Sequence, residues 1–133
     1  MPELFAPAEL HVARDSVPVM RIDGYSAQWV AWAGHAIAFE VVPKGFPPGG
    51  ENAFEGLPQN LCQCPHWGYL LKGKAGLRLA DRREVVINAG ELYYAPPGHQ
   101  IYAIEDFENI EFNPADLAAQ TMAAIGSNIA RTR

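Results

Sequence analysis

Apolar residues recur along this chain in short segments in which apolar and polar positions alternate, as they do in half-buried β-strands. In the clearest segment, from His35 to Val42, His35 shares one face with three apolar residues, and Glu40 lies on the other face. Twelve Gly and eleven Pro residues separate such segments, as turn residues do. The pattern predicts strands at residues 17–22, 27–32, 35–42, 66–71, 75–80, 84–87, 91–95, 101–104 and 108–112. Short strands at this spacing are typical of an all-β barrel or sandwich.

The last segment, residues 114–131, has the pattern of an amphipathic helix instead. Asn113 suits the N-cap, Pro114 suits the first helical position, and Asp116 favours the positive end of the helix dipole. Apolar residues then recur at spacings of four, three and four: Ala118, Met122, Ile125 and Ile129. This stripe predicts a C-terminal helix that packs on a sheet.

Two segments lack such patterns. Residues 1–15 are expected to be irregular, and residues 43–60 are rich in Pro and Gly and are expected to form a loop. A loop of this length in a compact domain is usually functional, so we interpret it as a possible lid. The total of 133 residues fits one domain, which we expect to span residues 1–133.

Composition and charge exclude several classes of protein. The net charge is −5, and the ten Lys and Arg residues form no basic run, so nucleic-acid binding is not expected. Apolar runs are all shorter than the ~18–20 residues of a membrane span, so no membrane association is expected. The first residues have no basic start and no apolar stretch of a secretory signal, which predicts a cytoplasmic protein.

The candidate chemistry is concentrated at the two cysteines of the chain. Cys62, Cys64 and His66 fall on one side if this stretch is extended, and Pro65 favours an extended Cys64. Thiolate and imidazole are preferred ligands of zinc. Free cysteines are also common as small buried apolar residues, and a buried histidine can simply be hydrogen bonded, so both interpretations stay open.

A second stretch, Gly90 to His99, is a predicted strand followed by the turn Pro96-Pro97-Gly98 and a histidine. Together the two stretches resemble the two motifs of the cupin superfamily. Gly73 matches the closing glycine of the first motif, and Gly90, Pro96 and Gly98 match the spacing of the second motif. His99 directly follows Gly98, two positions before the usual histidine of the family, but with the same strand parity. His66 and Cys62 occupy ligand positions of the first motif.

The resemblance implies an all-β cupin barrel with a C-terminal α-helix. It also implies one divalent metal ion, zinc by the chemistry of its donors, held by Cys62, Cys64, His66 and His99. His35 is the spare candidate ligand, but its apolar strand face makes a hydrogen-bonded core residue the expected role, and His11 is given no role. The family and the apolar residues on both faces of the strand from Trp67 to Leu71 imply a homodimer.

Two functions remain open at this point. In the first, all four residues close a tetrahedral site, and the metal has a structural or small-ligand-binding role. In the second, three residues hold the metal and leave a position for a small polar substrate, as in a metal-dependent hydrolase or isomerase. A dioxygenase fits less well, because iron that activates oxygen prefers two histidines and a carboxylate.

Overall fold

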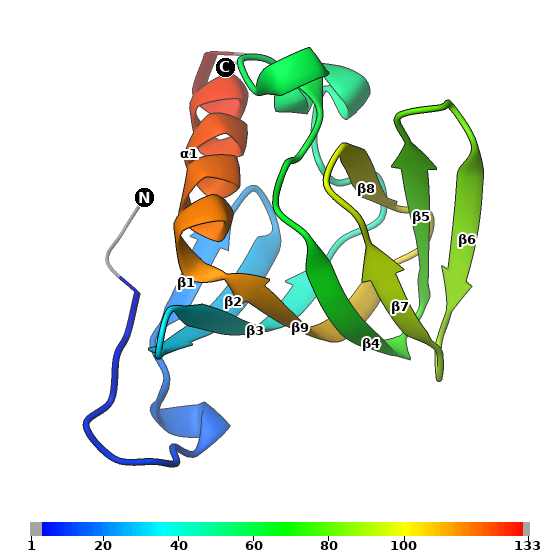
Figure 1. The fold of residues 1–133 in the computed structure, drawn as a ribbon. Coiled ribbons are helices and arrows are strands. Elements are labelled where there is room, and N and C mark those ends of the chain that lie inside the picture. The colour runs from blue at the N-terminus through cyan, green and yellow to red at the C-terminus, as the bar shows by residue number, and fades with distance from the viewer. Residues whose placement is uncertain (1–3, 132–133) are drawn as a thin grey trace.

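The computed structural model describes residues 4–131. Outside this description lie residues 132–133 and residues 1–3, which are the first residues of the segment predicted to be irregular. Within residues 4–131, nine strands form two antiparallel sheets (Figure 1). The larger sheet contains, in spatial order, β1 (Val19–Ile22), β2 (Tyr25–Trp32), β3 (His35–Val42), β9 (Phe107–Pro114), β4 (His66–Lys72) and β7 (Leu92–Ala95). The smaller sheet contains β6 (Glu84–Asn88), β5 (Lys74–Leu79) and β8 (His99–Ala103).

Each predicted strand is present, with ends that differ from the prediction by no more than two residues. The predicted helix is also present as α1 (Ala115–Arg131). The other segments are more ordered than predicted. The N-terminal part holds a short 3₁₀ helix, η1 (Arg14–Ser16), and the predicted loop holds two more, η2 (Gly50–Phe54) and η3 (Pro58–Asn60).

The predicted loop and α1 together cover one end of the barrel (Figure 1). Phe46 and Phe54 of the loop are buried in the hydrophobic core. The Asn128 side chain of α1 donates hydrogen bonds to the carbonyl oxygens of Ala53 (2.8 Å) and Glu55 (2.9 Å). The apolar stripe of the helix packs on the same core, so the helix and the loop are held to each other and to the barrel.

From Asn109 to Asn113, β9 turns polar side chains toward the interior and apolar side chains outward, whereas neighbouring strands add apolar side chains such as Trp29 and Leu70 to the interior. On β9, Asn109, Glu111 and Asn113 are buried, whereas Phe112 is 47% exposed. On β3 the apolar face predicted from the sequence is the outer face. The expectation that His35 is a core histidine is therefore wrong, because its side chain lies on this exposed face.

No helix among residues 4–131 has both the length and the apolar character that crossing a membrane requires.

The turn at Gly73 joins β4 to β5 and leaves no room for a side chain. Its φ is +85°, and a Cβ atom there would lie 1.9 Å from the carbonyl oxygen of Asp106. We expect Gly73→Ala to lower the free energy of unfolding by about 3 kcal/mol or more, measured by chemical denaturation. The matched control is Gly90→Ala, where φ is +89° but no atom lies within 4 Å. It should cost only the backbone strain of about 1–2 kcal/mol. Equal losses in both variants would contradict the steric argument.

Candidate metal site

The site forms where the start of β4 meets the start of β8. Cys62 pairs with His99 in an isolated antiparallel bridge, in which the Cys62 N–H donates to the His99 carbonyl oxygen at 2.8 Å. Gly98, at φ +85°, donates its N–H to the Cys62 carbonyl oxygen at 2.8 Å. His66 follows as the first residue of β4. The turn at Gly98 thus brings His99 opposite the cysteine segment.

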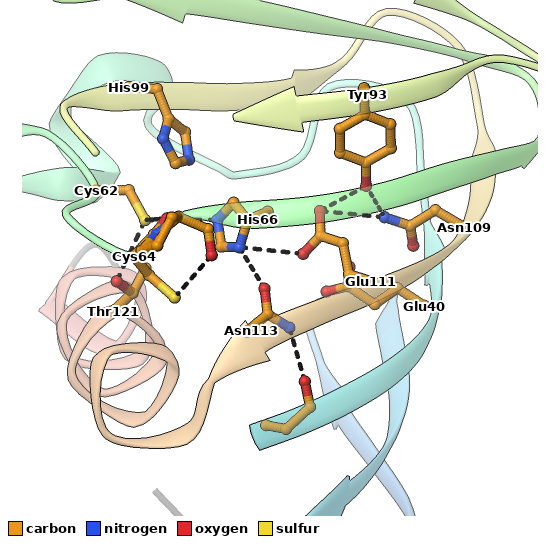
Figure 2. A network of polar contacts seen from close by, with 12 residues as sticks. Glu40, Cys62, Cys64, His66, Tyr93, His99, Asn109, Glu111, Asn113 and Thr121 are labelled. Atoms are coloured by element: carbon orange, nitrogen blue, oxygen red, sulfur yellow. Dashed lines mark hydrogen bonds and ion pairs between the residues drawn. The ribbon is translucent and has the colours of Figure 1, made fainter. Parts of the chain in front are cut away.

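Three of the four predicted ligands come together in the barrel interior (Figure 2). Potential ligand atoms of Cys62, His66 and His99 all lie within 4.8 Å of one another. Cys62 Sγ lies 3.6 Å from His66 Nε2, and the two imidazole rings meet edge to face with centroids 4.8 Å apart. Cys62 is 1% exposed and His99 is fully buried. Three ligand-type atoms are therefore gathered in one water-poor place.

Both imidazoles are fixed through Nδ1. His66 Nδ1 is hydrogen bonded to Asn113 Oδ1 and lies 3.3 Å from Glu111 Oε1. His99 Nδ1 lies 2.5 Å from the carbonyl oxygen of Pro96, which can only accept. A proton on each Nδ1 leaves the Nε2 lone pair free, which is how metal-ligating histidines are usually oriented.

His99 Nε2 is buried and has no hydrogen-bond partner within residues 4–131. A buried polar atom without a partner is uncommon and calls for an explanation. A divalent cation bound by Cys62, His66 and His99 would supply that partner, so the residues present fit a metal ion.

The thiol of Cys62 is tuned toward the thiolate. Burial raises its pKa, but the neighbouring imidazoles of His66 and His99 lower it to about 6. Burial lowers the pKa of His66, but Glu111 and the cysteines raise it well above its usual value. In the absence of a metal, Cys62 and His66 therefore form a thiolate–imidazolium pair, and a cation can replace the shared proton.

Cys64 interacts with His66 but does not belong to the group of three mutually close ligand atoms. It is buried like Cys62 and His66, so the predicted alternation along the segment is present. Its Sγ contacts the carbonyl oxygens of Pro65 (3.6 Å) and Pro114 (3.9 Å). It is not close to all three of the other predicted ligands at once. Burial raises the pKa of this thiol, so it stays protonated near neutral pH.

A polar network that sequence reasoning missed continues from His66 along the barrel interior (Figure 2). Tyr93 donates to Glu111 Oε2 at 2.6 Å, and Asn109 Nδ2 donates to the Tyr93 hydroxyl at 2.7 Å. Tyr25 donates a hydrogen bond to Glu40 on the neighbouring strands. The sequence does carry a signal, because polar residues alternate on β9 at 109, 111 and 113. If this polar face of the strand is taken as the interior face, the alternation predicts a buried polar network.

Part of this network, namely Tyr25, Glu40, Asn109 and Glu111, lines a cavity of about 70 Å³. Its wall combines the polar network with apolar side chains from both sheets, the 43–60 segment and α1. The residues are Tyr25, Trp29, Glu40, Val42, Phe46, Pro47, Phe54, Cys62, His66, Ile101, Tyr102, Phe107, Asn109, Glu111, Ala118, Thr121, Met122 and Ile125. The cavity has room for several waters or a small molecule next to Cys62 and His66.

Comparisons with known proteins place the fold. No protein-family model and no curated protein matches the sequence. The structure is similar to an RmlC-like cupin from Shewanella frigidimarina, with a TM-score of 0.59, 14% identity, and coverage of 81% of this chain and 93% of that chain. It is also similar to ectoine synthase from P. lautus, with a TM-score of 0.57, 7% identity, and coverage of 80% and 78%. A third similar structure is hydroxypropylphosphonic acid epoxidase from S. wedmorenis, with a TM-score of 0.60, 13% identity, and coverage of 79% and 59%.

At these identities the likeness shows the fold. The chain has the cupin barrel fold that its motifs predict, with a C-terminal helix packed on it. The prediction of the fold class is thereby confirmed.

The acid pair of the network predicts an unusual pH dependence of stability. Burial first, and then the nearby Glu111, raises the pKa of Glu40 from 4.5 to about 7, while Tyr25, His66 and Asn109 act in the opposite direction. Because the folded state holds this proton more tightly, the free energy of unfolding should fall as pH rises from about 4.5 to about 7. The Glu40→Gln variant lacks this titrating group, so its stability should not fall in this way. The difference in unfolding free energy, variant minus wild type, should therefore increase by about 1–3 kcal/mol between about pH 5 and pH 8.

The measurement is urea unfolding of wild type and Glu40→Gln at both pH values. The control is Glu105→Gln, which replaces an exposed carboxylate that is paired with Lys74. A difference between wild type and Glu40→Gln that does not change with pH would show that Glu40 is not the buried acid.

Proposed function

We propose that this protein binds one divalent metal ion, zinc, through Cys62, His66 and His99, and presents it to a small molecule in the barrel cavity. The observation that carries the proposal is the convergence of three ligand-type atoms within 4.8 Å. Each histidine is anchored at Nδ1, and His99 Nε2 has no other partner among the described residues.

Zinc is the metal that these donors favour. One thiolate and two imidazoles match the Cys and His ligands of tetrahedral zinc sites, whereas magnesium and calcium prefer oxygen. The nearest carboxylate, Glu111, lies beside His66 Nδ1 and orients that ring, which is the role of an outer-shell residue. Free, buried thiols also fit the proposed cytoplasmic location, where cysteines stay reduced.

The number of ligands separates a structural role from a ligand-binding one. A closed site needs Cys64 as the fourth ligand, but its thiol faces two carbonyl oxygens. Zinc with three protein ligands keeps a position for water or for an oxygen atom of a ligand, which it polarises as a Lewis acid. We therefore favour the open site.

The alternative is a metal-dependent enzyme, and one observation favours it. Glu40 lines the same cavity and has a pKa of about 7, so it can accept or donate a proton at neutral pH. A hydrolase or an isomerase needs such a group. A dioxygenase fits the donors less well, because the set lacks a carboxylate ligand.

We further propose that the protein is a homodimer that pairs through the outer face of the larger sheet. Trp67 is 48% exposed there and lies between Phe112 of β9 and Tyr94 of β7, which is 51% exposed. The Trp67 and Tyr94 rings are in contact, with centroids 5.5 Å apart. A cluster of exposed aromatic residues on one face is typical of an interaction surface, and a twofold pair is the commonest solution.

The metal proposal is tested by measuring zinc content and affinity in purified variants. Cys62→Ser and His99→Gln should each lower zinc affinity at least tenfold, because each removes a ligand. Cys64→Ser should retain stoichiometric zinc, since its thiol is not part of the converging group. The control is His35→Gln, which changes an exposed histidine of β3.

Two results would contradict parts of this proposal. Stoichiometric zinc in Cys62→Ser would exclude the thiolate as a ligand. Loss of zinc in Cys64→Ser but not in the His35→Gln control would favour the closed, structural site over the open one.

The dimer is tested by sedimentation equilibrium. Trp67→Glu should convert a wild-type dimer into a monomer, because it places a charge at the centre of the aromatic cluster. The matched control is Val86→Glu, on an exposed apolar side chain of the smaller sheet, which should remain dimeric. A monomeric wild-type protein would contradict the proposal outright.

A further inference from the structure

The cavity contains a second polar group besides the metal ligands: the carboxylates of Glu40 and Glu111. We propose that these two carboxylates form a cation-binding subsite, which takes the ammonium or guanidinium group of a small ligand in this cavity. The inference deepens the proposed function. It rests on that function only in assuming that another part of the same ligand binds the metal.

Strand pairing places the two acids together. Glu40 of β3 is the register partner of Asn109 on β9, and Glu111 is two residues further along the same face of β9. Two side chains in this diagonal relation across an antiparallel pair are close enough to interact. Both side chains line the cavity.

The direct partners of the two acids are mostly neutral. Tyr25 donates to Glu40, and Tyr93 donates to Glu111. No Lys or Arg lines this cavity in the described part of the chain; the ion pairs of those residues that the structure records involve other acids. The contact of His66 through Nδ1 is with Glu111 and not with Glu40. Among residues 4–131, no recorded hydrogen bond or ion pair joins Glu40 to a cationic side chain.

Such an arrangement is costly for the free protein. Burying a carboxylate near another carboxylate without a cation is unfavourable, and replacing such groups by neutral ones often stabilises a fold. The raised pKa of Glu40 reflects the same burial and repulsion. A ligand that brings a positive charge with N–H donors would remove this cost.

Two further cavity-lining atoms lack hydrogen-bond partners among residues 4–131. Asn109 Oδ1 is a buried acceptor beside the carboxylates, and Trp29 Nε1 is a buried donor. The free acceptor adds to the carboxylate oxygens as a target for N–H groups. The aromatic rings of Trp29 and Tyr25 in the same wall also favour a cation.

The remaining wall defines the rest of the ligand. Val42, Phe46, Phe107 and Ile125 contribute apolar surface, and Cys62 and His66 lie at the metal end. Glu111 contacts His66 directly, so the acidic and metal ends are adjacent. The ligand class is therefore a short molecule with a cationic nitrogen and an oxygen atom that can reach the metal.

The test uses isothermal titration calorimetry on the zinc-loaded, full-length protein. The probes are methylguanidinium and its neutral near-isostere N-methylurea. Methylguanidinium should bind at least tenfold more tightly than N-methylurea, because only the cation meets the charge of the acid pair. Glu40→Gln should lose at least tenfold in methylguanidinium affinity and keep its weak binding of N-methylurea.

Glu105→Gln, on an exposed side chain outside the cavity, is the matched control and should bind both probes as wild type does. The comparison of the two probes on wild type needs no variant, so the test stands even if Glu40→Gln does not fold. Equal affinities for the two probes, absence of binding, or an unchanged affinity in folded Glu40→Gln would overturn the inference.

The same titration on Cys62→Ser separates this inference from the metal proposal. Cation preference that persists in zinc-free Cys62→Ser would support the acidic subsite without the metal. A wild-type protein that takes up no zinc but prefers the cation would refute the metal proposal and support the subsite. Zinc binding without cation preference would support the metal proposal and refute the subsite.

Discussion

The pairing of β9 with both β3 and β4 is the constraint on which the interior of this protein depends. Through β3 it sets Glu40 opposite Asn109, and through β4 it brings His66 beside the inner face that carries Glu111 and Asn113. Side chains alternate along each strand, so a shift of one residue in either pairing would move these groups to the outer face. The polar network and the candidate metal ligands are therefore consequences of one register.

Charge balance connects the two ends of the cavity. At one end, the imidazoles of His66 and His99 favour the thiolate form of Cys62, which is the form that binds metals. At the other end, Glu111 holds His66 at Nδ1 and raises the pKa of Glu40. Glu111 thus interacts with both His66 and Glu40, so the candidate metal site and the acid pair are electrostatically connected.

The same alternation gives the outer face of the larger sheet its character. The inner positions of β9 from Asn109 to Asn113 are polar, and the alternating outer positions of β4 and β9 carry Trp67 and Phe112, which are about half exposed. An ordinary half-buried sheet has few polar residues inside and few aromatic residues outside. Both departures are explained if the outside is covered by a second copy and the polar part of the inside holds a ligand.

Local sequence determined the elements. Alternation and turn residues placed all nine strands and α1 within two residues, and the motif around Gly73, Gly90 and Gly98 predicted the cupin barrel. The predicted cap Asn113 belongs instead to β9, and its side chain bonds His66 and the Ala36 carbonyl oxygen. Parity along the 62–66 segment also grouped Cys62 with His66, because strand geometry is a local property. The tertiary structure alone decided which face of each strand is the interior, and this is why His35 is exposed and Glu40 lines the interior cavity. The tertiary structure also decided that the Cys64 thiol contacts backbone oxygens while His99 pairs with Cys62. Both outcomes depend on how β8, β9 and α1 pack across the barrel. The local sequence pattern does not encode such long-range packing.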